Sequence, residues 1–170
     1  MKITDVKVHI LQSKLEQPFA FSQGWVRVRS ATIVEIHTDA GLIGWGEAFT
    51  QGLESPQIAA STIEYSLKPL VLGENPKNVE VLWHSMYNQT RDFGRKGSVM
   101  AAISGIDIAV WDILGKFYQV PVSQLIGGRF RASVQPYATG FYRVTGENEG
   151  DRLAEEAIAH NDAGFKAMKI

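Results

Sequence analysis

The sequence predicts an α+β domain, an antiparallel three-stranded meander plus helices, followed by a strand–helix–strand unit. Residues 2–49 alternate apolar with polar side chains or are rich in β-branched residues, which is typical of strands. Residues 55–126 repeat apolar side chains at helical spacing, and residues 133–170 return to a strand, a helix and a strand. A unit of that last kind is parallel and right-handed in nearly all known folds.

The meander is predicted from the segments 2–12, 27–38 and 42–49, with a tight turn at Asp39-Ala40-Gly41 between the last two. The segment Glu16–Val26, between the first two strands, has more residues than a simple hairpin needs and is predicted as a long aromatic loop. Long loops that keep aromatic residues tend to serve as lids or flaps, so this segment is a candidate binding loop.

The middle of the chain predicts four helical segments. Ser55 followed by Pro56 is a good N-cap with proline at the first helical position. The helices are expected over 55–70, from Asn75 or Asn78 through Met86, over 98–118 and over 121–126. In the last part of the chain, strands are expected over 133–139 and 165–170, with a helix over 148–162 between them.

Several polar residues have structural interpretations. The four histidines are scattered without ligand spacing and are interpreted as surface or packing residues. Asp107 and Asp112 are five positions apart on a predicted helix and do not share one face. Asp112 and Lys116 are interpreted as an ordinary i,i+4 ion pair.

Composition excludes several function classes. The chain has 170 residues, a formal net charge of -1 and no cysteine, which rules out disulfides and thiolate metal sites. Lys and Arg do not gather into a basic stripe, so nothing favours nucleic acid. The first residues lack an apolar signal core, and no apolar run approaches the length of a membrane span. We expect a cytoplasmic protein with no nucleic-acid and no membrane partner.

The last stretch, 164–170, predicts a strand that carries a lysine into a polar site. Strand alternation places Phe165, Ala167 and Lys169 on one face. A lysine on such a face is costly unless it meets water, an anion or a metal-bound substrate. Two parallel strands alone do not make a stable sheet, so either this unit docks on the meander or most of its sheet is missing, and we expect the second, with the fold continuing beyond residue 170.

Three segments resemble a known enzyme family. Residues 102–116, AISGIDIAVWDILGK, and the continuation PVSQLIGG at 121–128 resemble the helix signature of the mandelate racemase and muconate lactonizing enzyme family. The segment GWGEA at 44–48 resembles the family's lead into a second active-site loop, and 164–169 resembles the start of its lysine strand. The resemblance spans essentially the whole chain. The family belongs to the enolase superfamily, in which a Lys or His base works beside magnesium.

The resemblance implies an N-terminal α+β capping domain over residues 1–130 and the first βαβ of a truncated (β/α)8-type barrel over 131–170. It implies Mg2+ as the cofactor, with carboxylate ligands on later barrel strands, so no metal ligand is named here. Lys169 aligns with the first lysine of the family's Lys-x-Lys motif and is the catalytic candidate, whereas the second lysine would be residue 171. Without that partner, we expect the chain alone to be inactive. The full-length protein is implied to be a homo-oligomer.

The implied reaction starts with removal of the proton α to a carboxylate. Such a carbon acid is far weaker than any side chain, so a lysine with an ordinary pKa of about 10.4 removes its proton only if the resulting enediolate is stabilised. Magnesium on the carboxylate oxygens and a lysine ammonium provide that stabilisation. The outcome stays open between racemisation, dehydration and cycloisomerisation.

Substrate contacts are expected from two capping loops and the first barrel strand. The candidates are Phe19, Phe21, Ser22 and Trp25 on the first loop, Phe49, Thr50 and Gln51 on the second, and Thr139 near the end of the strand. The hydroxyl and amide groups suit a polyol acid, whereas the aromatic rings suit an aromatic or N-acyl amino acid. The alternative is that several of the aromatic residues pack the cap onto the barrel.

The segments 82–97 and 137–140 most resemble the acid-sugar branch of the family, which includes galactarolactone cycloisomerases and sugar-acid dehydratases. A small-molecule carboxylic acid, and within that class a sugar acid, is therefore the expected substrate. The competing hypothesis is a non-catalytic cap-like domain that oligomerises or binds a partner through an open strand edge.

Overall fold

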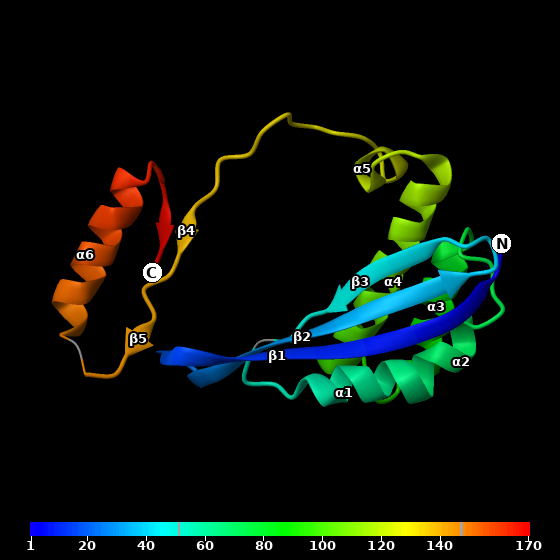
Figure 1. Cartoon of the computed structure of the whole chain (residues 1–170), viewed down its shortest axis with the longest axis horizontal. Helices are drawn as coiled ribbons and strands as arrows, with labels where there is room; N and C mark the ends of the chain where they lie inside the picture. Colours follow the sequence, from blue (N-terminus) through cyan, green and yellow to red (C-terminus); the bar gives the residue numbers. More distant parts are fainter. Residues whose placement is uncertain (51, 147) are drawn as a thin grey trace. The chain divides into compact units, whose positions relative to one another are not determined.

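The structure is a computed structural model that describes residues 1–50, 52–146 and 148–170 (Figure 1). It falls into two compact units: unit 1 comprises Met1–Ser13 and Arg29–Gly128, and unit 2 comprises Lys14–Val28 and Arg129–Ile170. Strands β1 (Ile3–Phe21) and β2 (Gly24–Thr38) contribute residues to both units. The predicted domain boundary between residues 130 and 131 stays a prediction.

Unit 1 holds the predicted meander. β1 and β2 are hydrogen-bonded neighbours, and β3 (Ile43–Ala48) pairs with β2 in antiparallel register, with His37 opposite Ile43. Buried side chains alternate along β2, where Val34 and Ile36 point inward. This alternation arises because one face of the sheet packs on helices. The prediction of a three-stranded antiparallel meander is confirmed.

The prediction of a long aromatic loop over Glu16–Val26 was wrong. β1 continues to Phe21 and β2 starts at Gly24, so the segment is the end of a β-hairpin with a two-residue turn. Aromatic and β-branched residues favour strands, and β5 (Arg143–Val144) pairs antiparallel with the end of β1. That pairing joins residues far apart in the sequence, so local patterns could not predict it.

One continuous helical run occupies the place of the helix predicted over 55–70. It consists of α1 (Pro56–Ser61), the π-helical segment η1 (Thr62–Leu67) and α2 (Lys68–Val71). The π-helical segment ends at Leu67, two residues before Pro69. Proline has no N–H to donate, and its ring collides with the carbonyl oxygen four residues earlier in an α-helix. The wider π turn accommodates the proline without breaking the run.

Three further helices follow, α3 (Val79–Thr90), α4 (Ser98–Tyr118) and α5 (Val122–Leu125). They match the predicted positions, although α3 continues past Met86 and Asn78 makes no side-chain cap hydrogen bond. By length and composition α4 is the one described helix that could cross a membrane, but a set of its apolar side chains is buried in the core of unit 1. Its buried residues form the centre of the core in unit 1: Ala102, Ile103, Ile106, Ala109, Val110, Ile113 and Leu114.

Glycines in β3 let α4 come close to the sheet. A Cβ atom added at Gly46 would lie 2.1 Å from the carbonyl oxygen of Gly105, and one added at Gly44 would lie 2.1 Å from that of Ala109. Residues two apart on a strand share a face, so both glycines turn toward the helix. The segment GWGEA therefore has a packing role, because glycine permits such close backbone approach.

Asp112 and Lys116 do more than pair with each other, because they also bind the free edge of β3. Asp112 Oδ2 accepts the Trp45 N–H at 2.9 Å, and Lys116 Nζ donates to the Ile43 carbonyl oxygen at 2.6 Å. The two side chains lie 2.6 Å apart. An edge strand otherwise leaves such backbone groups unpaired. The pair closes one edge of the sheet.

We expect Asp112→Ala to lower the free energy of unfolding by about 1–3 kcal/mol, because the Trp45 N–H and the Lys116 ammonium lose their shared acceptor. Urea unfolding measures the change. The control is Asp92→Ala, whose side chain is 95% exposed and which should change stability by less than about 0.5 kcal/mol. Equal effects of the two substitutions would contradict the edge-closing role.

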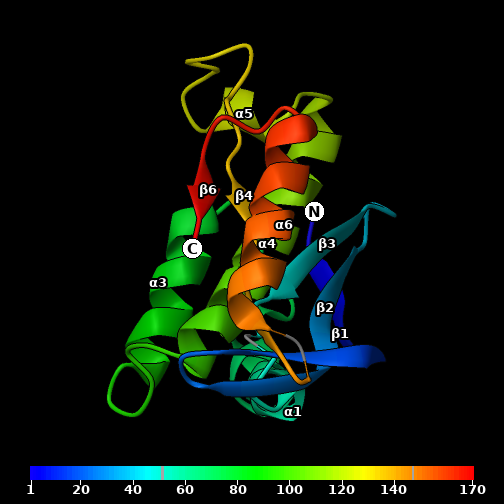
Figure 2. The ribbon, with the colours of Figure 1, turned by 90° about the vertical axis from the view of Figure 1, so that its left-hand side faces the viewer.

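Unit 2 contains the predicted strand–helix–strand unit, made of β4 (Ala138–Thr139), α6 (Glu149–Asp162) and β6 (Met168–Lys169). β4 and β6 pair in parallel, and α6 lies beside them (Figures 1 and 2). The strands are shorter than the predicted 133–139 and 165–170. Among the described residues no third strand pairs with this sheet, and a two-stranded sheet by itself is only marginally stable.

Candidate functional site

Lys169 and Thr139 lie opposite each other in the parallel pair of β4 and β6. Ala138 and Met168 are also opposite each other; Ala138 is buried and Met168 is half-buried. Because side chains alternate along a strand, Lys169 and Thr139 share the other face, and both are exposed. The structure thus brings these two predicted site residues together. An ammonium with three donors stands next to a hydroxyl that donates or accepts.

The predicted alternation over 165–170 holds only within β6. Phe165 precedes the strand, and its ring contacts the ring of His160 on α6, with centroids 5.8 Å apart. The prediction that Phe165 shares a strand face with Lys169 was therefore wrong. Lys169 is exposed, so its ammonium is hydrated. Water is one of the three partners, with an anion or a metal-bound substrate, that would offset the cost of a lysine at this position.

The hairpin end in unit 2 carries four predicted substrate contacts. Phe19 is half-buried, and its ring centroid lies 4.5 Å from that of Tyr142, with the ring planes tilted by 40°. Phe21 is half-buried at the end of β1, Ser22 is exposed in the turn, and Trp25 is 37% exposed. Phe19 therefore has a packing role, whereas Ser22 and Trp25 present a hydroxyl and an indole to solvent. Substrate contact stays a prediction for all four.

The second group of predicted contacts follows β3 in unit 1. Phe49 is 64% exposed and presents its ring to solvent. Thr50 is buried, and its Oγ1 donates to the Ser30 carbonyl oxygen at 3.1 Å. That hydroxyl already supports the local backbone, so it retains only its acceptor lone pairs for other partners. Gln51 lies outside the described residues.

The sequence patterns did not point to Arg152 and Glu156, which hold the segment after β4. Glu156 Oε1 accepts the Phe141 N–H at 2.9 Å, and Glu156 Oε2 lies 3.0 Å from Arg152 Nη1. Arg152 Nη2 donates to the Tyr142 carbonyl oxygen. The i,i+4 spacing of the two charges on a helix was the available signal. This spacing predicts an ion pair between Arg152 and Glu156, but it does not predict that both side chains also hydrogen-bond to the backbone of residues 141–142.

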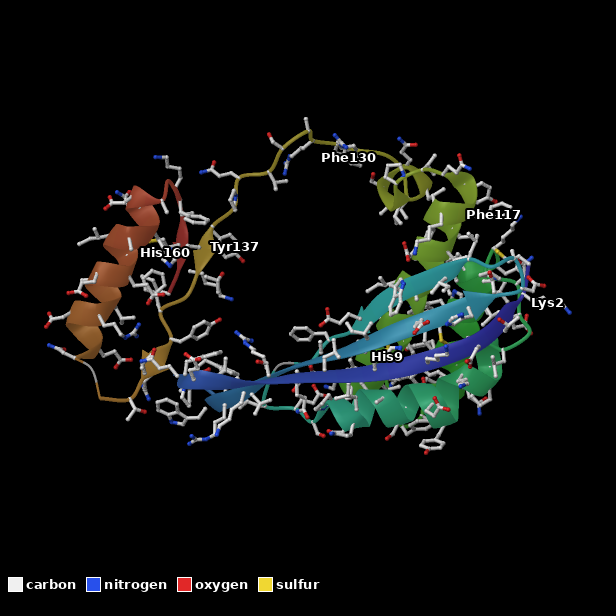
Figure 3. All side chains as sticks on the ribbon, viewed as in Figure 1. Lys2, His9, Phe117, Phe130, Tyr137 and His160 are labelled. Atoms are coloured by element: carbon white, nitrogen blue, oxygen red, sulfur yellow. The ribbon has the colours of Figure 1, made fainter. Side chains whose placement is uncertain are left out.

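Glu35 on β2 lies between two histidines in unit 1. Its Oε2 is 2.6 Å from His9 Nε2, and its Oε1 is 2.5 Å from His37 Nε2 (Figure 3 labels His9). The hydrogen bond from His9, helped by that from His37, lowers the pKa of Glu35 against the opposing effect of burial. The two histidines are hydrogen-bond partners of one carboxylate. In residues 1–50, 52–146 and 148–170 no group of three or more His, Cys, Asp or Glu side chains is placed to hold a metal ion.

The lowered pKa of Glu35 predicts a pH-dependent contribution to stability. A carboxyl whose folded-state pKa lies below its ordinary value, 4.5, stabilises the fold above that value and loses this effect as the pH falls through the folded-state pKa. We expect Glu35→Gln to be less stable than the wild type at pH 7, with the difference shrinking at pH 3. Denaturant unfolding at both pH values measures it. Glu47→Gln, an exposed change on β3, is the control, and a Glu35→Gln difference unchanged by pH would contradict the prediction.

A pocket of about 290 Å³ lies along α3 and α4 in unit 1. It is lined by Glu80, Trp83, His84, Asp107 and Trp111. Burial, with the nearby charge of Glu80, raises the pKa of Asp107. No predicted site residue lines this pocket, so the candidate site is the Thr139–Lys169 pair with the neighbouring parts of unit 2.

An α+β domain of this topology, followed by a parallel strand pair that presents a lysine, defines the N-terminal part of an enolase-superfamily protein. The chain belongs to the mandelate racemase / muconate lactonizing enzyme family, and its residues 3–127 match the N-terminal domain of that family. The resemblance predicted from the helix signature is confirmed.

Two curated relatives and one solved structure illustrate the similarity. D-galactarolactone cycloisomerase of Agrobacterium fabrum is 37% identical over 170 residues, which cover 100% of this chain and 44% of that protein. Arabinonate dehydratase of Saccharolobus solfataricus is 40% identical over 137 residues, or 80% of this chain and 35% of that protein. The crystal structure of 3,6-anhydro-D-galactonate cycloisomerase from Zobellia galactanivorans matches with a TM-score of 0.80 and 35% identity, covering 99% of this chain and 42% of that one. The similarity to the acid-sugar branch is confirmed, and the chain spans less than half the length of these relatives.

Proposed function

We propose that this chain is the N-terminal part of a magnesium-dependent enzyme that removes the proton α to the carboxylate of a small sugar acid. The observation that carries the proposal is the position of Lys169, exposed at the end of β6 and opposite Thr139. Active sites of barrel enzymes lie at the carboxyl ends of the strands. The sugar-acid names of the relatives support the substrate class.

The two side chains suit the proposed chemistry. When the α-proton leaves, negative charge moves onto the carboxylate oxygens, and a cation beside them stabilises that state more than the substrate. The Lys169 ammonium supplies the cation, and the Thr139 hydroxyl supplies a second hydrogen bond. Magnesium, when bound, would neutralise further charge. It enters through family membership alone, because the described residues offer no ligand group for it.

The exposed side chains of the hairpin and the names of the relatives support the proposed substrate class. A polyol acid suits the hydroxyls of Ser22 and Thr139, both of which are exposed. The exposed indole of Trp25 favours a second candidate, racemisation of an N-acyl or aromatic amino acid. We place the enzyme in the cytoplasm as a homo-oligomer without nucleic-acid or membrane partners; the net charge of -1 supports only the lack of a nucleic-acid partner.

The test is exchange of the substrate α-proton in heavy water, followed by NMR with the native gene product and Mg2+. We expect exchange with sugar acids such as arabinonate and D-galactonate, and slower exchange with N-acyl amino acids. Preferential exchange with N-acyl amino acids would favour the second candidate. If neither sugar acids nor N-acyl amino acids exchange and the protein self-associates, the hypothesis of a non-catalytic cap-like domain would be favoured.

A further inference from the structure

The segment after β4 has a backbone conformation that its neighbours must maintain. Phe141 has φ of 61°, in the left-handed region that non-glycine residues rarely adopt. Such a conformation persists only where surrounding contacts determine it. The Phe141 N–H donates to Glu156 Oε1 at 2.9 Å, and its ring centroid lies 5.8 Å from that of His160; Figure 3 labels His160. Both of these contacts come from α6.

Gly140 gives Glu156 access to this segment. A Cβ atom at Gly140 would lie 2.3 Å from Glu156 Oε1. The other carboxylate oxygen lies 3.0 Å from Arg152 Nη1, and Arg152 donates to the Tyr142 carbonyl oxygen. The side chains of Arg152 and Glu156 are 20% and 27% exposed, so water shields their charges only in part. Charge-assisted hydrogen bonds of this kind are stronger than neutral ones.

The segment 140–142 joins two parts of the predicted site within unit 2. Thr139 stands directly before it, opposite Lys169. Directly after it, β5 pairs with the hairpin, with Val144 opposite Phe19, and the Tyr142 ring packs on the Phe19 ring. A change in the path of 140–142 therefore moves both the strand end and the aromatic hairpin.

We propose that Arg152 and Glu156, here named the α6 clamp, are positioning residues that fix segment 140–142 and thereby place Thr139 and the hairpin around the substrate. This inference rests on the proposed function, in which Thr139 and Lys169 face the substrate carboxylate. A displacement of about 1 Å at a reacting group costs on the order of 100-fold in rate. The clamp touches no substrate, so its effect is on the geometry of the site.

The first test compares Glu156→Ala and Glu156→Gln with Glu155→Ala in the full-length native protein. Glu155 is the exposed neighbour of Glu156 on α6, so Glu155→Ala makes the same chemical change one position away. We expect Glu156→Ala to lower kcat/KM for arabinonate α-proton exchange about 100-fold, mostly through kcat. Glu156→Gln keeps an acceptor for the Phe141 N–H but loses the negative charge, so we expect kcat/KM to fall about tenfold. Glu155→Ala should keep the wild-type rate.

Amide hydrogen exchange reports on the clamp independently of activity. We expect the amides of Phe141 and of hairpin residues 19–20 to exchange faster in Glu156→Ala and to stay unchanged in Glu155→Ala. If Glu156→Ala does not fold, the isosteric Glu156→Gln variant takes its place in both measurements. Unchanged amide exchange would overturn the clamp, and faster amide exchange with an unchanged kcat/KM would overturn its positioning role. A wild-type protein without α-proton exchange would refute the proposed function, whereas the amide data would still decide whether the clamp exists.

Discussion

Gly46→Ala is expected to lower the free energy of unfolding by about 3 kcal/mol or more, which is at or above the upper end of the usual range for overpacking. The added Cβ would lie 2.1 Å from the Gly105 carbonyl oxygen and 2.8 Å from the Ala109 nitrogen. Both are backbone atoms in the middle of α4 and cannot rotate away as a side chain can. The strand and the helix must separate, and the close-packed core between them loses contacts along its length. Denaturant unfolding followed by circular dichroism measures the loss.

Gly150→Ala is the matched control for this prediction. The nearest atom to a Cβ at Gly150 is Asn148 Oδ1 at 3.8 Å, an ordinary contact. Gly150 lies in α6, where alanine is favoured over glycine, so stability should be unchanged or rise by up to about 1 kcal/mol. A Gly46→Ala protein as stable as the wild type would mean that β3 and α4 do not pack as closely as described.

Local patterns in the sequence predicted most of the helices. The helix predicted over 98–118 has these bounds in the structure, because a long apolar repeat with a period near 3.6 carries its own signal. The hairpin end at 16–26 was not predictable in the same way. Its strands extend where β5 supplies a partner from a distant part of the sequence, and no periodicity within the segment encodes that contact.

The individual residues of the candidate site could be predicted from the sequence, but their positions relative to one another could not. The sequence indicates Lys169 and Thr139 by separate signals: Lys169 lies in a lysine motif, and Thr139 lies near a strand end. Their position opposite each other depends on the register of the parallel pair, which strand parity alone does not determine. Likewise, i,i+4 spacing predicts the Asp112–Lys116 pair but not its bonds to the edge of β3, because those depend on tertiary packing.

In the proposed full-length enzyme, Lys169→Met is expected to lower kcat/KM for sugar-acid α-proton exchange by about 100- to 1000-fold, the range found when one donor to a developing negative charge is removed. Lys169 is exposed opposite Thr139, where its ammonium is free to approach a bound carboxylate. The charge on the substrate oxygens grows as the proton leaves, so most of the loss should fall on kcat rather than on KM. Stability should change by less than about 0.5 kcal/mol, because the side chain is at the surface.

Lys166→Met is the control, because it removes the same charge from an exposed lysine that lies outside β6. It should keep the wild-type kcat. A loss shared by both variants and confined to KM would indicate a general effect of positive charge on an anionic substrate. Lys169→Arg should recover part of the rate, because it keeps the charge but replaces the compact ammonium with a planar guanidinium. If Lys169→Met exchanges the α-proton at the wild-type rate, Lys169 is not a catalytic residue, and the proton transfer depends on other side chains.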